Sequence, residues 1–482
     1  MAPPSFSRES LRFDAVAYLE ANASAWPEAT AIYDLGQRVS FAELAAVVEG
    51  LTERLRSEGL RPAESVGVRL PNIWQYVALE LAIPAAGGVI MPLPLSLGDA
   101  EMAWAMEKSG AGRLITEAEL EMLFGQPPPG VTSPVGPAPA PSLPARPERS
   151  VEIALTSGTT GLPKLAALSA GLKQATFEGF TSRLEVTDED RVLVMSPLTQ
   201  GIGGMCLFCL RLGASLIMLH EPRFTPERVL RLVAEHRATM LVGVPTNVIR
   251  LLDSGELPGA DLSSLRVTAV AGAPMAPDAA RDWEERSGSR VCIFYGSMDA
   301  GQLSVGSPSD PVTKRHHTVG RPHDCCEVLI TKEGEICMKG DTVQGRYWGE
   351  TFGPHSADGW VHMGDLGRLD ADGYLLVVGR LKDLIIRGGT NINPHEVEAV
   401  IRRHPAVADV CVVGRPDREL GERAVAFVVA RGKLDLETLR SFLADQGMAR
   451  YKWPEEVLSI AEIPLSGPGK VNRRALREQL LT

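Results

Sequence analysis

The sequence has few aromatic residues, no excess of positive charge and no long uninterrupted apolar run. Its longest apolar stretch, residues 77–95, contains Glu80, two adjacent glycines and three prolines, so we expect no membrane span. The formal net charge of -11 argues against nucleic acid as a partner, because that requires a dense positive surface. Residues 1–10 lack a basic segment followed by an apolar one, which predicts no signal peptide and a cytoplasmic location.

The seven cysteines have no regular spacing, which excludes a disulfide framework of the kind found in small secreted domains. Cys206 and Cys209 form a C-x-x-C pair inside an apolar run, which is more typical of buried small residues than of a metal or redox site. Cys325 and Cys326 are adjacent and have no partner cluster. We expect all seven to be free thiols in a reducing compartment.

The first part of the chain alternates helical and strand patterns, and 482 residues suffice for two or more domains. Ser40 and Glu43 predict a capping box that begins a helix ending near residue 59. Strands at 65–70 and 88–93 with a helix at 72–82 predict crossover units and largely parallel sheets. Residues 126–150 contain nine prolines and predict an extended connector.

Polar or small residues follow several predicted strands in the middle of the chain. After two strands within 191–219 come strands at 240–244, 267–271 and 291–294. In parallel α/β sheets, ligands bind beyond the carboxyl ends of the strands. We therefore expect these strand ends to meet at one crevice.

After about residue 320 the pattern changes to short strands and turns. Asn393 predicts a helix N-cap with Pro394 at the first position and Glu396 completing a capping box. We predict an α/β protein with a large N-terminal domain, residues 1–379, of mainly parallel sheets with packed helices. A small α+β C-terminal domain, residues 380–482, follows a boundary near 380–383.

A loop rich in hydroxyls and glycines follows the apolar run at 151–155 and ends in a lysine. Glycines allow tight turns that present backbone N–H groups to an anion, so the loop suits a polyphosphate. An ordinary polar turn has the same composition, and the spacing is not that of the G-x-x-x-x-G-K-[ST] P-loop. The loop reads Thr156-Ser157-Gly158-Thr159-Thr160-Gly161-Leu162-Pro163-Lys164.

Together with five later motifs in the family's order, this loop resembles the adenylate-forming superfamily of acyl- and aryl-CoA synthetases, adenylation domains and luciferases. Residues 295–299 resemble its Y-G-x-T-E motif, residues 360–365 its [YW]-x-x-T-G-D motif, and residues 464–470 its terminal P-x-x-x-x-G-K motif. Residues 272–274 resemble the adenine-side loop, and residues 379–383 resemble the hinge motif. The resemblance extends from about Ser40 to Leu476.

The resemblance implies a role for each matching residue. The implied catalytic residues are Lys470, Thr160 and Asp299, with Asp299 also holding Mg²⁺. The C-terminal domain would be mobile about a hinge near 380–383, with Lys382 as the hinge residue. Gly388 and Gly389 would line the CoA channel. The implied acid pocket contains Gln200, Gly201, Asn247, Gly301 and Gln302. The implied ATP- or AMP-binding residues are Thr156, Ser157, Gly158, Thr159, Thr160, Gly161, Lys164, Gly272, Ala273, Pro274, Tyr295, Gly296, Met298, Asp365, Arg380 and Lys470.

Three positions depart from the family's pattern. Met298 replaces a threonine that directs a hydroxyl at the α-phosphate, and Asp299 replaces a longer glutamate. Gln200 stands where many CoA ligases have histidine. Magnesium keeps several waters, so one water can bridge the gap left by Asp299. We expect Met298 and Gln200 to contribute to the selection of the acid.

The resemblance implies an AMP-forming acid–CoA ligase, which makes an acyl-adenylate from ATP and then transfers the acyl group to CoA. The expected partners are ATP, Mg²⁺, CoA and an aromatic, alicyclic or medium-chain acid, with no nucleic acid. A stand-alone adenylation enzyme that loads a carrier protein is the alternative, although no carrier motif follows Lys470. A non-enzymatic sensor of ATP or acyl-adenylate is a third possibility. The chain is expected to be a monomer or a homodimer.

Overall fold

A computed structural model of the chain describes residues 16–125, 150–156, 164–220, 224–298, 300–343, 345–350, 356, 358–466 and 470–480. The predicted connector lies outside these ranges except for its last residue, Ser150. The chain divides into two compact units, each described separately below. The larger unit comprises Met1–Val328 and Met338–Val361, and the smaller unit comprises Leu329–Cys337 and His362–Thr482.

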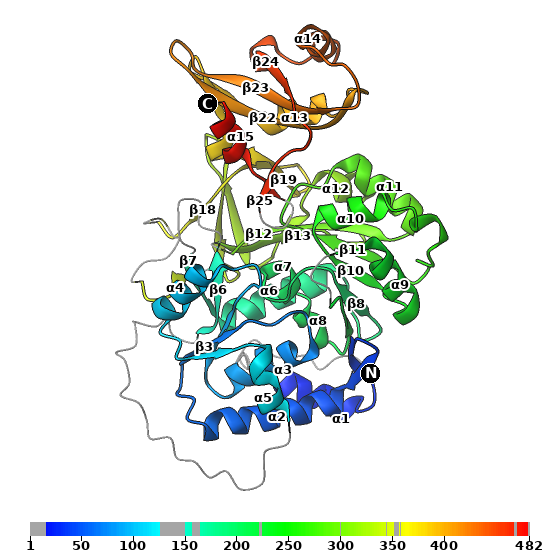
Figure 1. Ribbon diagram of the computed structural model, residues 1–482, viewed down its shortest axis with the longest axis vertical. Coiled ribbons are helices and arrows are strands. Elements are labelled where there is room, and N and C mark those ends of the chain that lie inside the picture. Colours follow the sequence, from blue (N-terminus) through cyan, green and yellow to red (C-terminus); the bar gives the residue numbers. More distant parts are fainter. Residues whose placement is uncertain are drawn as a thin grey trace. The chain divides into compact units, whose positions relative to one another are not determined.

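The central sheet of the larger unit has the strand order β14-β13-β12-β11-β10-β8-β9-β1-β2. Figure 1 labels its strands β8, β10, β11, β12 and β13. From β12 to β1 each strand runs parallel to its neighbour, whereas β2, β13 and β14 are antiparallel additions at the two ends. The strands are β1 (Thr30–Asp34), β2 (Gln37–Ser40), β8 (Arg191–Val194), β9 (Ser215–Met218), β10 (Met240–Gly243), β11 (Val267–Val270), β12 (Arg290–Ser297), β13 (Gly301–Val305) and β14 (Arg321–Pro322).

Both faces of this sheet are buried, as a parallel sheet requires. Alternate residues point to opposite faces, so that Val192 and Leu193 of β8 belong to two different hydrophobic clusters. Trp283 packs in the cluster that contains Leu193, and Phe180 packs in the other. The first of these clusters includes α9 (Pro226–His236), α10 (Pro245–Leu252) and α11 (Pro277–Ser287), and the second includes α6 (Ala170–Arg183) and α8 (Leu207–Leu210).

A second sheet of the larger unit has the order β17-β7-β6-β4-β3-β5. Its strands are β3 (Ser65–Val68), β4 (Val89–Pro92), β5 (Arg113–Ile115), β6 (Ser150–Thr156), β7 (Lys164–Ser169) and β17 (Arg346–Tyr347). The helices in the sequence around it are α1 (Ala17–Ala25), α2 (Phe41–Ser57), α3 (Trp74–Ala85), α4 (Asp99–Ser109) and α5 (Glu117–Phe124). The predicted crossover units are confirmed, because β3 pairs in parallel with both β4 and β5.

The predicted capping box of α2 is confirmed. The Glu43 amide donates to Ser40 Oγ over 3.1 Å, and the Ser40 amide donates to Glu43 Oε2 over 2.8 Å. The two bonds satisfy backbone donors that the first helical turn leaves free. Hydrogen bonding to Ser40 holds the pKa of Glu43 below its usual range.

The smaller unit contains a sheet of order β21-β20-β23-β22, with β24 also paired to β23. A further sheet has the order β15-β16-β18-β19. The strands are β15 (Cys326–Ile330), β16 (Glu335–Gly340), β18 (Val361–Leu369), β19 (Leu375–Arg380), β20 (Ile385–Arg387), β21 (Thr390–Ile392), β22 (Val407–Asp417), β23 (Gly421–Ala430) and β24 (Glu456–Ser459). The helices are α13 (Pro394–Ile401), α14 (Leu436–Asp445) and α15 (Arg473–Gln479).

Asn393 is the N-cap of α13, but the capping box predicted for this helix was wrong. Asn393 Oδ1 accepts from the His395 amide over 3.1 Å, which is the second helical position rather than the third. The Glu396 carboxylate instead pairs with Lys452 over 2.5 Å. The Glu396 carboxylate therefore takes part in a tertiary ion pair with Lys452 and not in the helix cap.

The predicted fold class is confirmed, with a large α/β part of mainly parallel sheets and a smaller α+β part. The smaller compact unit begins at His362 and also includes Leu329–Cys337, and the domain boundary at 379/380 stays a prediction. A hinge is defined by movement between two states, so the pivot near 380–383 stays a prediction. All seven cysteines are described, and none of them forms a disulfide, as predicted. Across the described ranges, every helix is too short or too polar to cross a bilayer.

Candidate active site

Four parallel strands of the larger unit bring predicted site residues to one edge of the central sheet. Val194 of β8 is level with Val242 of β10, and Val270 of β11 is level with Ile293 of β12. Gly243 of β10 is in turn level with Val270. The segments that leave β8, β10 and β11 carry Gln200, Asn247 and Gly272, and β12 itself continues past Ile293 through Tyr295. The structure therefore confirms that β8, β10 and β11 end together, at the edge where ligands of parallel sheets bind.

Two glycines near this edge, Gly201 and Gly296, lie where an added Cβ atom would meet a close neighbour. A Cβ atom at Gly201 would lie 2.6 Å from Met298 Sδ, so Gly201 at the start of α7 (Gly201–Gly204) faces Met298 beyond β12. A Cβ atom at Gly296 would lie 2.4 Å from the Gly301 carbonyl oxygen, at a bulge between β12 and β13. The predicted acid-pocket segment and the Tyr295–Met298 segment are thus neighbours. Asp299 lies outside the described residues.

Gly272 adopts a positive φ of +83° directly beyond β11. A Cβ atom there would lie 3.0 Å from Ile202 Cδ1. Gly272 and Pro274 are exposed and Ala273 is half-buried, so the predicted adenine-side loop is open to a ligand. Ile202, on α7, is a neighbour of this loop that the sequence did not single out.

The predicted phosphate loop joins two strands that pair antiparallel, β6 and β7. Thr156 and Lys164 are cross-strand partners at its two ends, and residues 157–163, which include Ser157, Gly158, Thr159, Thr160 and Gly161, lie outside the described ranges. Thr156 is 2% exposed, and its Oγ1 has no hydrogen-bond partner in the described part of the chain. The threonine at the start of the loop is thus deeply buried.

Lys164 contacts a tyrosine that no sequence motif indicated. Lys164 Nζ lies 3.3 Å from the Tyr347 hydroxyl and 4.7 Å from the centre of its ring. A cation above an aromatic face is attracted to the ring electrons, which orients the ammonium group. Tyr347 is buried on β17, which pairs with β7, so the contact follows from sheet pairing across 183 positions of sequence.

Two predicted acid-pocket residues are tied into the protein interior. Asn247 Oδ1 accepts from the Val244 amide over 2.9 Å at the start of α10. Gln302 Oε1 lies 2.9 Å from His323 Nε2, and Gln302 Nε2 donates to Met205 Sδ over 3.4 Å. Burial, with Arg183 nearby, lowers the pKa of His323 to about 4. A neutral imidazole that no motif indicated therefore holds Gln302 in place.

Two predicted nucleotide-binding residues of the smaller unit are cross-strand partners. Asp365 on β18 is level with Arg380 on β19, and Arg380 Nε lies 3.0 Å from Asp365 Oδ1. The carboxylate is 9% exposed and the guanidinium is 49% exposed. The acid and base are thus held together, with the base open to solvent. The motifs predicted both residues but not their pairing.

The predicted hinge and CoA-channel residues are exposed. Lys382 lies in a short 3₁₀ turn, Leu381–Asp383. Gly388 and Gly389, with φ of +55° and +80°, form the two-residue turn between β20 and β21. Two consecutive positive φ values suit the tight hairpin and are accessible to glycine without strain. The backbone of Lys470 pairs with Ser466 in a short hairpin, and its side chain lies outside the described part of the structure.

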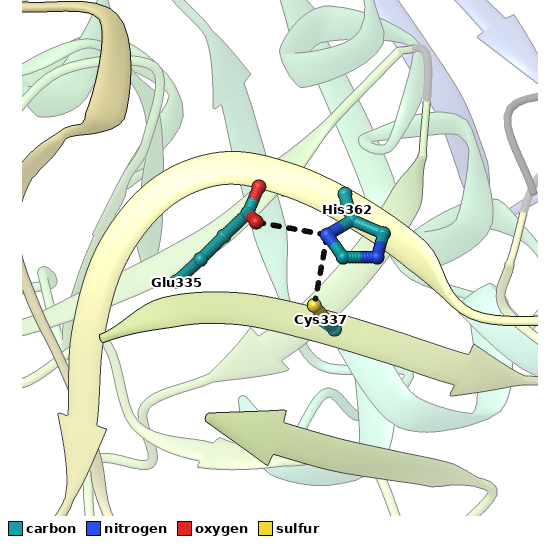
Figure 2. Close-up of side chains that lie close together, drawn as sticks. All are labelled: Glu335, Cys337 and His362. Atoms are coloured by element: carbon teal, nitrogen blue, oxygen red, sulfur yellow. Dashed lines mark hydrogen bonds and ion pairs between the residues drawn. The ribbon is translucent and has the colours of Figure 1, made fainter. Parts of the chain in front are cut away.

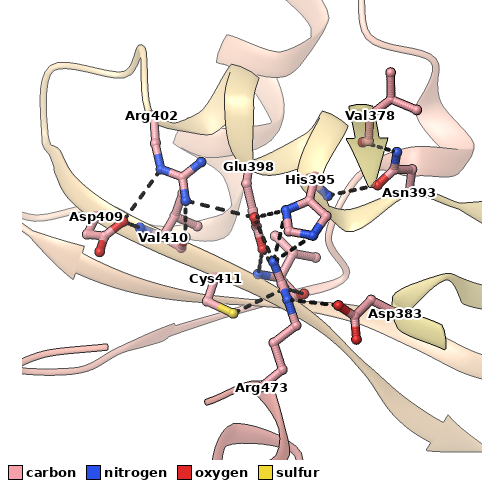
Figure 3. A network of polar contacts seen from close by, with 11 residues as sticks. Val378, Asp383, Asn393, His395, Glu398, Arg402, Asp409, Val410, Cys411 and Arg473 are labelled. Carbon is pink, nitrogen blue, oxygen red and sulfur yellow. Dashed lines mark hydrogen bonds and ion pairs between the residues drawn. The ribbon is translucent and has the colours of Figure 1, made fainter. Parts of the chain in front are cut away.

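A buried polar network anchors the helix that follows Lys470 (Figure 3). Arg473, the first residue of α15, makes two hydrogen bonds to Glu398 on α13, of 2.7 Å and 2.9 Å. Its Nε lies 3.6 Å from Asp383 Oδ2, next to the predicted hinge residue. The Val412 amide also donates to Glu398 over 2.7 Å. Arg473 therefore connects the C-terminal segment with α13, β22 and the predicted hinge.

Comparison with known proteins identifies the family. The sequence profile of the AMP-binding enzymes matches residues 19–348, more than half of the chain. The chain belongs to the AMP-binding enzyme family. The profile of the AMP-binding enzyme C-terminal domain matches residues 396–470, which end at Lys470. The resemblance inferred from the motifs is thus confirmed at the level of the family.

Individual AMP-binding enzymes resemble the chain over nearly its whole length. Feruloyl-CoA synthase of an Amycolatopsis species is 33% identical over 476 residues, which cover 94% of this chain and 96% of that protein. ATP-bound MatB from Rhodopseudomonas palustris has a TM-score of 0.82 at 27% identity, covering 97% of this chain and 98% of that one. Amide bond synthetase McbA from Marinactinospora thermotolerans has a TM-score of 0.82 at 28% identity, covering 96% and 99%.

Proposed function

We propose that this chain is an AMP-forming carboxylic acid–CoA ligase with ATP, a carboxylic acid and CoA as substrates. The observation that carries the proposal is the common edge at which β8, β10 and β11 end and past which β12 continues, beside Gly201, Gly272 and Met298. Family membership and the similarity to a feruloyl-CoA synthase support the same activity.

In the first step a carboxylate oxygen attacks the α-phosphorus of ATP. A new O–P bond forms, the bond to the β-phosphate bridging oxygen breaks, and pyrophosphate leaves. Two anions must approach each other, so fixed positive charge and N–H or O–H donors lower the barrier. We assign this task to Lys470, Lys164 and the hydroxyls of residues 156–160. Lys164 is already oriented by Tyr347.

In the second step the CoA thiol attacks the carbonyl carbon of the acyl-adenylate. A C–S bond forms, the C–O bond to AMP breaks, and the thiol proton is released. A pivot at Lys382 would remove Lys470 after the first step and bring the Gly388–Gly389 turn to the thiol. Movement of a small domain between two chemical steps is a known form of gating.

Mg²⁺ stays a prediction for this enzyme, as does a cytoplasmic location. Asp299, the predicted magnesium ligand, lies outside the described residues, and the steps above do not depend on it. Asp365 and Arg380 are proposed to hold the ribose and phosphate groups, with Arg380 being released from Asp365 when the ribose hydroxyls bind the carboxylate.

For the acid we propose an aromatic, alicyclic or medium-chain carboxylate. The feruloyl-CoA synthase similarity favours the aromatic members of this group. Gly201 and Met298 face each other, so a side chain at either position changes the space at this point. We therefore assign part of the acid selection to Met298 together with Gln200. Met298→Thr and Gln200→His should alter the order of preferred acids, and an unchanged order would contradict this assignment.

The deciding experiment is acid-dependent exchange of labelled pyrophosphate into ATP, measured with aromatic, alicyclic and medium-chain acids. We expect at least one acid to support exchange, and CoA to convert the trapped adenylate to a thioester with release of AMP. If no acid in any class supports exchange, the chain is not an acid-activating enzyme. Binding of ATP without exchange would support the sensor alternative.

Lys470→Ala tests the division of labour between the two steps. Loss of one positively charged donor should lower adenylate formation by about 10²–10³-fold. Thioester formation from supplied acyl-adenylate should be retained. Lys433→Ala, an exposed lysine of the smaller unit, is the matched control and should leave both steps unchanged. Equal loss of both steps in Lys470→Ala would refute the assignment.

Lys382→Pro tests the pivot. A proline fixes φ, so it should impede rotation at residue 382 and slow thioester formation while sparing adenylate formation. Lys433→Pro introduces the same residue at an exposed loop position of the same unit. Thioester formation at the wild-type rate in Lys382→Pro would show that rotation at this residue is not required.

The second candidate function is acyl transfer to a nucleophile other than CoA. The similarity to an amide bond synthetase favours an amine, and a carrier-protein thiol is the other acceptor. Supplying pre-formed adenylate with CoA, an amine or a carrier protein, and identifying the product by mass, separates the three. We expect the CoA thioester to form fastest.

A further inference from the structure

Three side chains of metal-binding type converge in the smaller unit (Figure 2). Glu335 and Cys337 are two positions apart on β16, so they project from the same face of the strand. His362, on the neighbouring strand β18, points toward both. His362 Nδ1 lies 2.8 Å from Glu335 Oε2 and 3.4 Å from Cys337 Sγ. His362 Nδ1, Glu335 Oε2 and Cys337 Sγ thus lie close to one another.

The spacing of these atoms matches that of ligands around one ion. All three atoms lie within 4.8 Å of one another. Zinc bonds of about 2.0 Å to nitrogen and oxygen and about 2.3 Å to sulfur place tetrahedral ligands about 3.3–3.5 Å apart. The nitrogen–sulfur separation already has this value. The nitrogen–oxygen separation has to open by about 0.5 Å, which a carboxylate rotation can provide.

Contacts around the cluster hold the ligands in place. Glu335 Oε1 accepts from the Gly364 amide over 3.2 Å, which turns Oε2 toward His362. Hydrogen bonds of this kind to a liganding carboxylate fix its orientation and raise metal affinity. Cys337 is fully buried within β16, whereas the His362 side chain is 47% exposed. The imidazole side of the cluster therefore gives an ion access from solvent.

The ligand types select the metal. A thiolate and an imidazole favour Zn²⁺, whereas Mg²⁺ and Ca²⁺ prefer an all-oxygen shell. We propose that Glu335, Cys337 and His362 form a Zn²⁺ site with three protein ligands and a water in the fourth position. Binding releases the Cys337 thiol proton to solvent, and the proton on His362 moves to Nε2 so that Nδ1 offers its lone pair. None of these three residues has a part in the proposed acid activation.

Co²⁺ is the probe for this site, because it replaces Zn²⁺ and shows a near-ultraviolet charge-transfer band only when a thiolate is bound. Full-length protein is stripped with chelator and titrated with Co²⁺ in a Cys325→Ser/Cys326→Ser background, which removes the adjacent pair of thiols. We expect one Co²⁺ per chain, a band for a single thiolate, and displacement of the band by Zn²⁺. Release of protons should accompany binding.

Single variants assign the ligands. Cys337→Ser should abolish the band, and His362→Asn and Glu335→Gln should weaken binding by about 10–100-fold. Cys411→Ser is the matched control, because Cys411 is a second buried cysteine of the same unit and contacts Arg473 rather than the cluster. If Cys337→Ser does not fold, His362→Asn decides, since its side chain is half exposed. Absence of the band in the parent protein, or a band that persists in Cys337→Ser or at full affinity in His362→Asn, would show a hydrogen-bonded trio without metal affinity.

Discussion

Each of the two units buries a group of charged side chains, but with opposite balance of charge. In the larger unit, Lys173 on α6 pairs with two carboxylates, Glu80 on α3 at 2.9 Å and Glu152 on β6. In the smaller unit, one carboxylate, Glu398, is bound by Arg473 through two hydrogen bonds and approached by His395 at 3.3 Å (Figure 3). The first group has more acid than base, and the second has more base around its acid.

This difference decides the direction in which the pKa of each carboxyl moves. Burial and the nearby Glu152 raise the pKa of Glu80 to about 7, although Lys173 opposes the change. Burial would also raise the pKa of Glu398, but hydrogen bonds from His395 and Arg473 lower it to about 2. Desolvation alone therefore does not predict the state of a buried acid, because the partners that share its site determine the sign.

The largest effect is expected when the basic partner is removed from Glu398. Arg473→Met should lower the free energy of unfolding of the smaller unit by about 3–5 kcal/mol, since it leaves a buried carboxylate without its main partner. Hydrogen exchange at the Val412 amide, which donates to Glu398, reports the change directly. Arg474→Met is the matched control, because Arg474 makes an exposed pair with Glu478. Equal effects at 473 and 474 would refute the comparison.

The next effect is expected at low pH, because protonation of Glu398 should lower the free energy of unfolding of the smaller unit. The folded pKa of Glu398 lies below its usual 4.5, so its contribution is complete above pH 4.5 and is lost as the pH falls toward 2. The full loss corresponds to about 3 kcal/mol. Urea unfolding from pH 6 to pH 3 should show a steeper loss of stability for the wild type than for Glu398→Gln. Parallel pH curves would mean that Glu398 is not held ionised by its partners.

Removal of Lys173, the base shared by two carboxylates in the larger unit, should lower the free energy of unfolding by less than Arg473→Met does. Lys173→Met leaves Glu80 and Glu152 facing each other, but one of them can take up a proton near neutral pH and so limit the penalty. We expect a loss of about 2 kcal/mol at pH 8 and less at pH 6. Hydrogen exchange in α3 and α6 measures it. A loss that does not depend on pH in this range would contradict the charge balance described above.

The last effect concerns Glu80→Gln, which removes the acid and keeps its base. Because the folded pKa of Glu80 is raised, the wild type loses stability as the pH rises from 4.5 to about 7. Glutamine cannot ionise, so this pH-dependent loss should be absent in the variant. Thermal unfolding at several pH values measures the difference between the two curves. Glu178→Gln, on the same helix as Lys173, should follow the wild-type curve.

Local sequence signals predicted much of the fold. Ser40 with Glu43, and Pro394 at the start of α13, mark helix starts that the structure confirms, because caps and first-turn prolines act on the backbone within one turn. The same kind of signal failed at Glu396, whose carboxylate pairs with Lys452. Lys452 lies 56 positions from Glu396, far outside the single helical turn on which a capping prediction depends.

In the candidate site too, motifs predicted individual residues but not the contacts between them. The motifs indicated Lys164, Gln302 and Asp365, because the chemistry of ATP requires particular residue types in a given order. Their partners, Tyr347, His323 and Arg380, are set by strand pairing or packing. Only Arg380 belonged to a motif, and its pairing with Asp365 was not predicted. Spacing along the chain carries no information on which side chains meet across a sheet.

The sequence by itself determined the family, the parallel α/β class and the residue types that ATP chemistry needs, since these depend on local motifs and periodicity. Tertiary structure alone decided that Gly201 faces Met298, that Glu335, Cys337 and His362 converge, and that Glu80 and Glu398 are perturbed in opposite directions. Each of these depends on distances between atoms far apart in sequence. Such distances are fixed only when the sheets and helices pack.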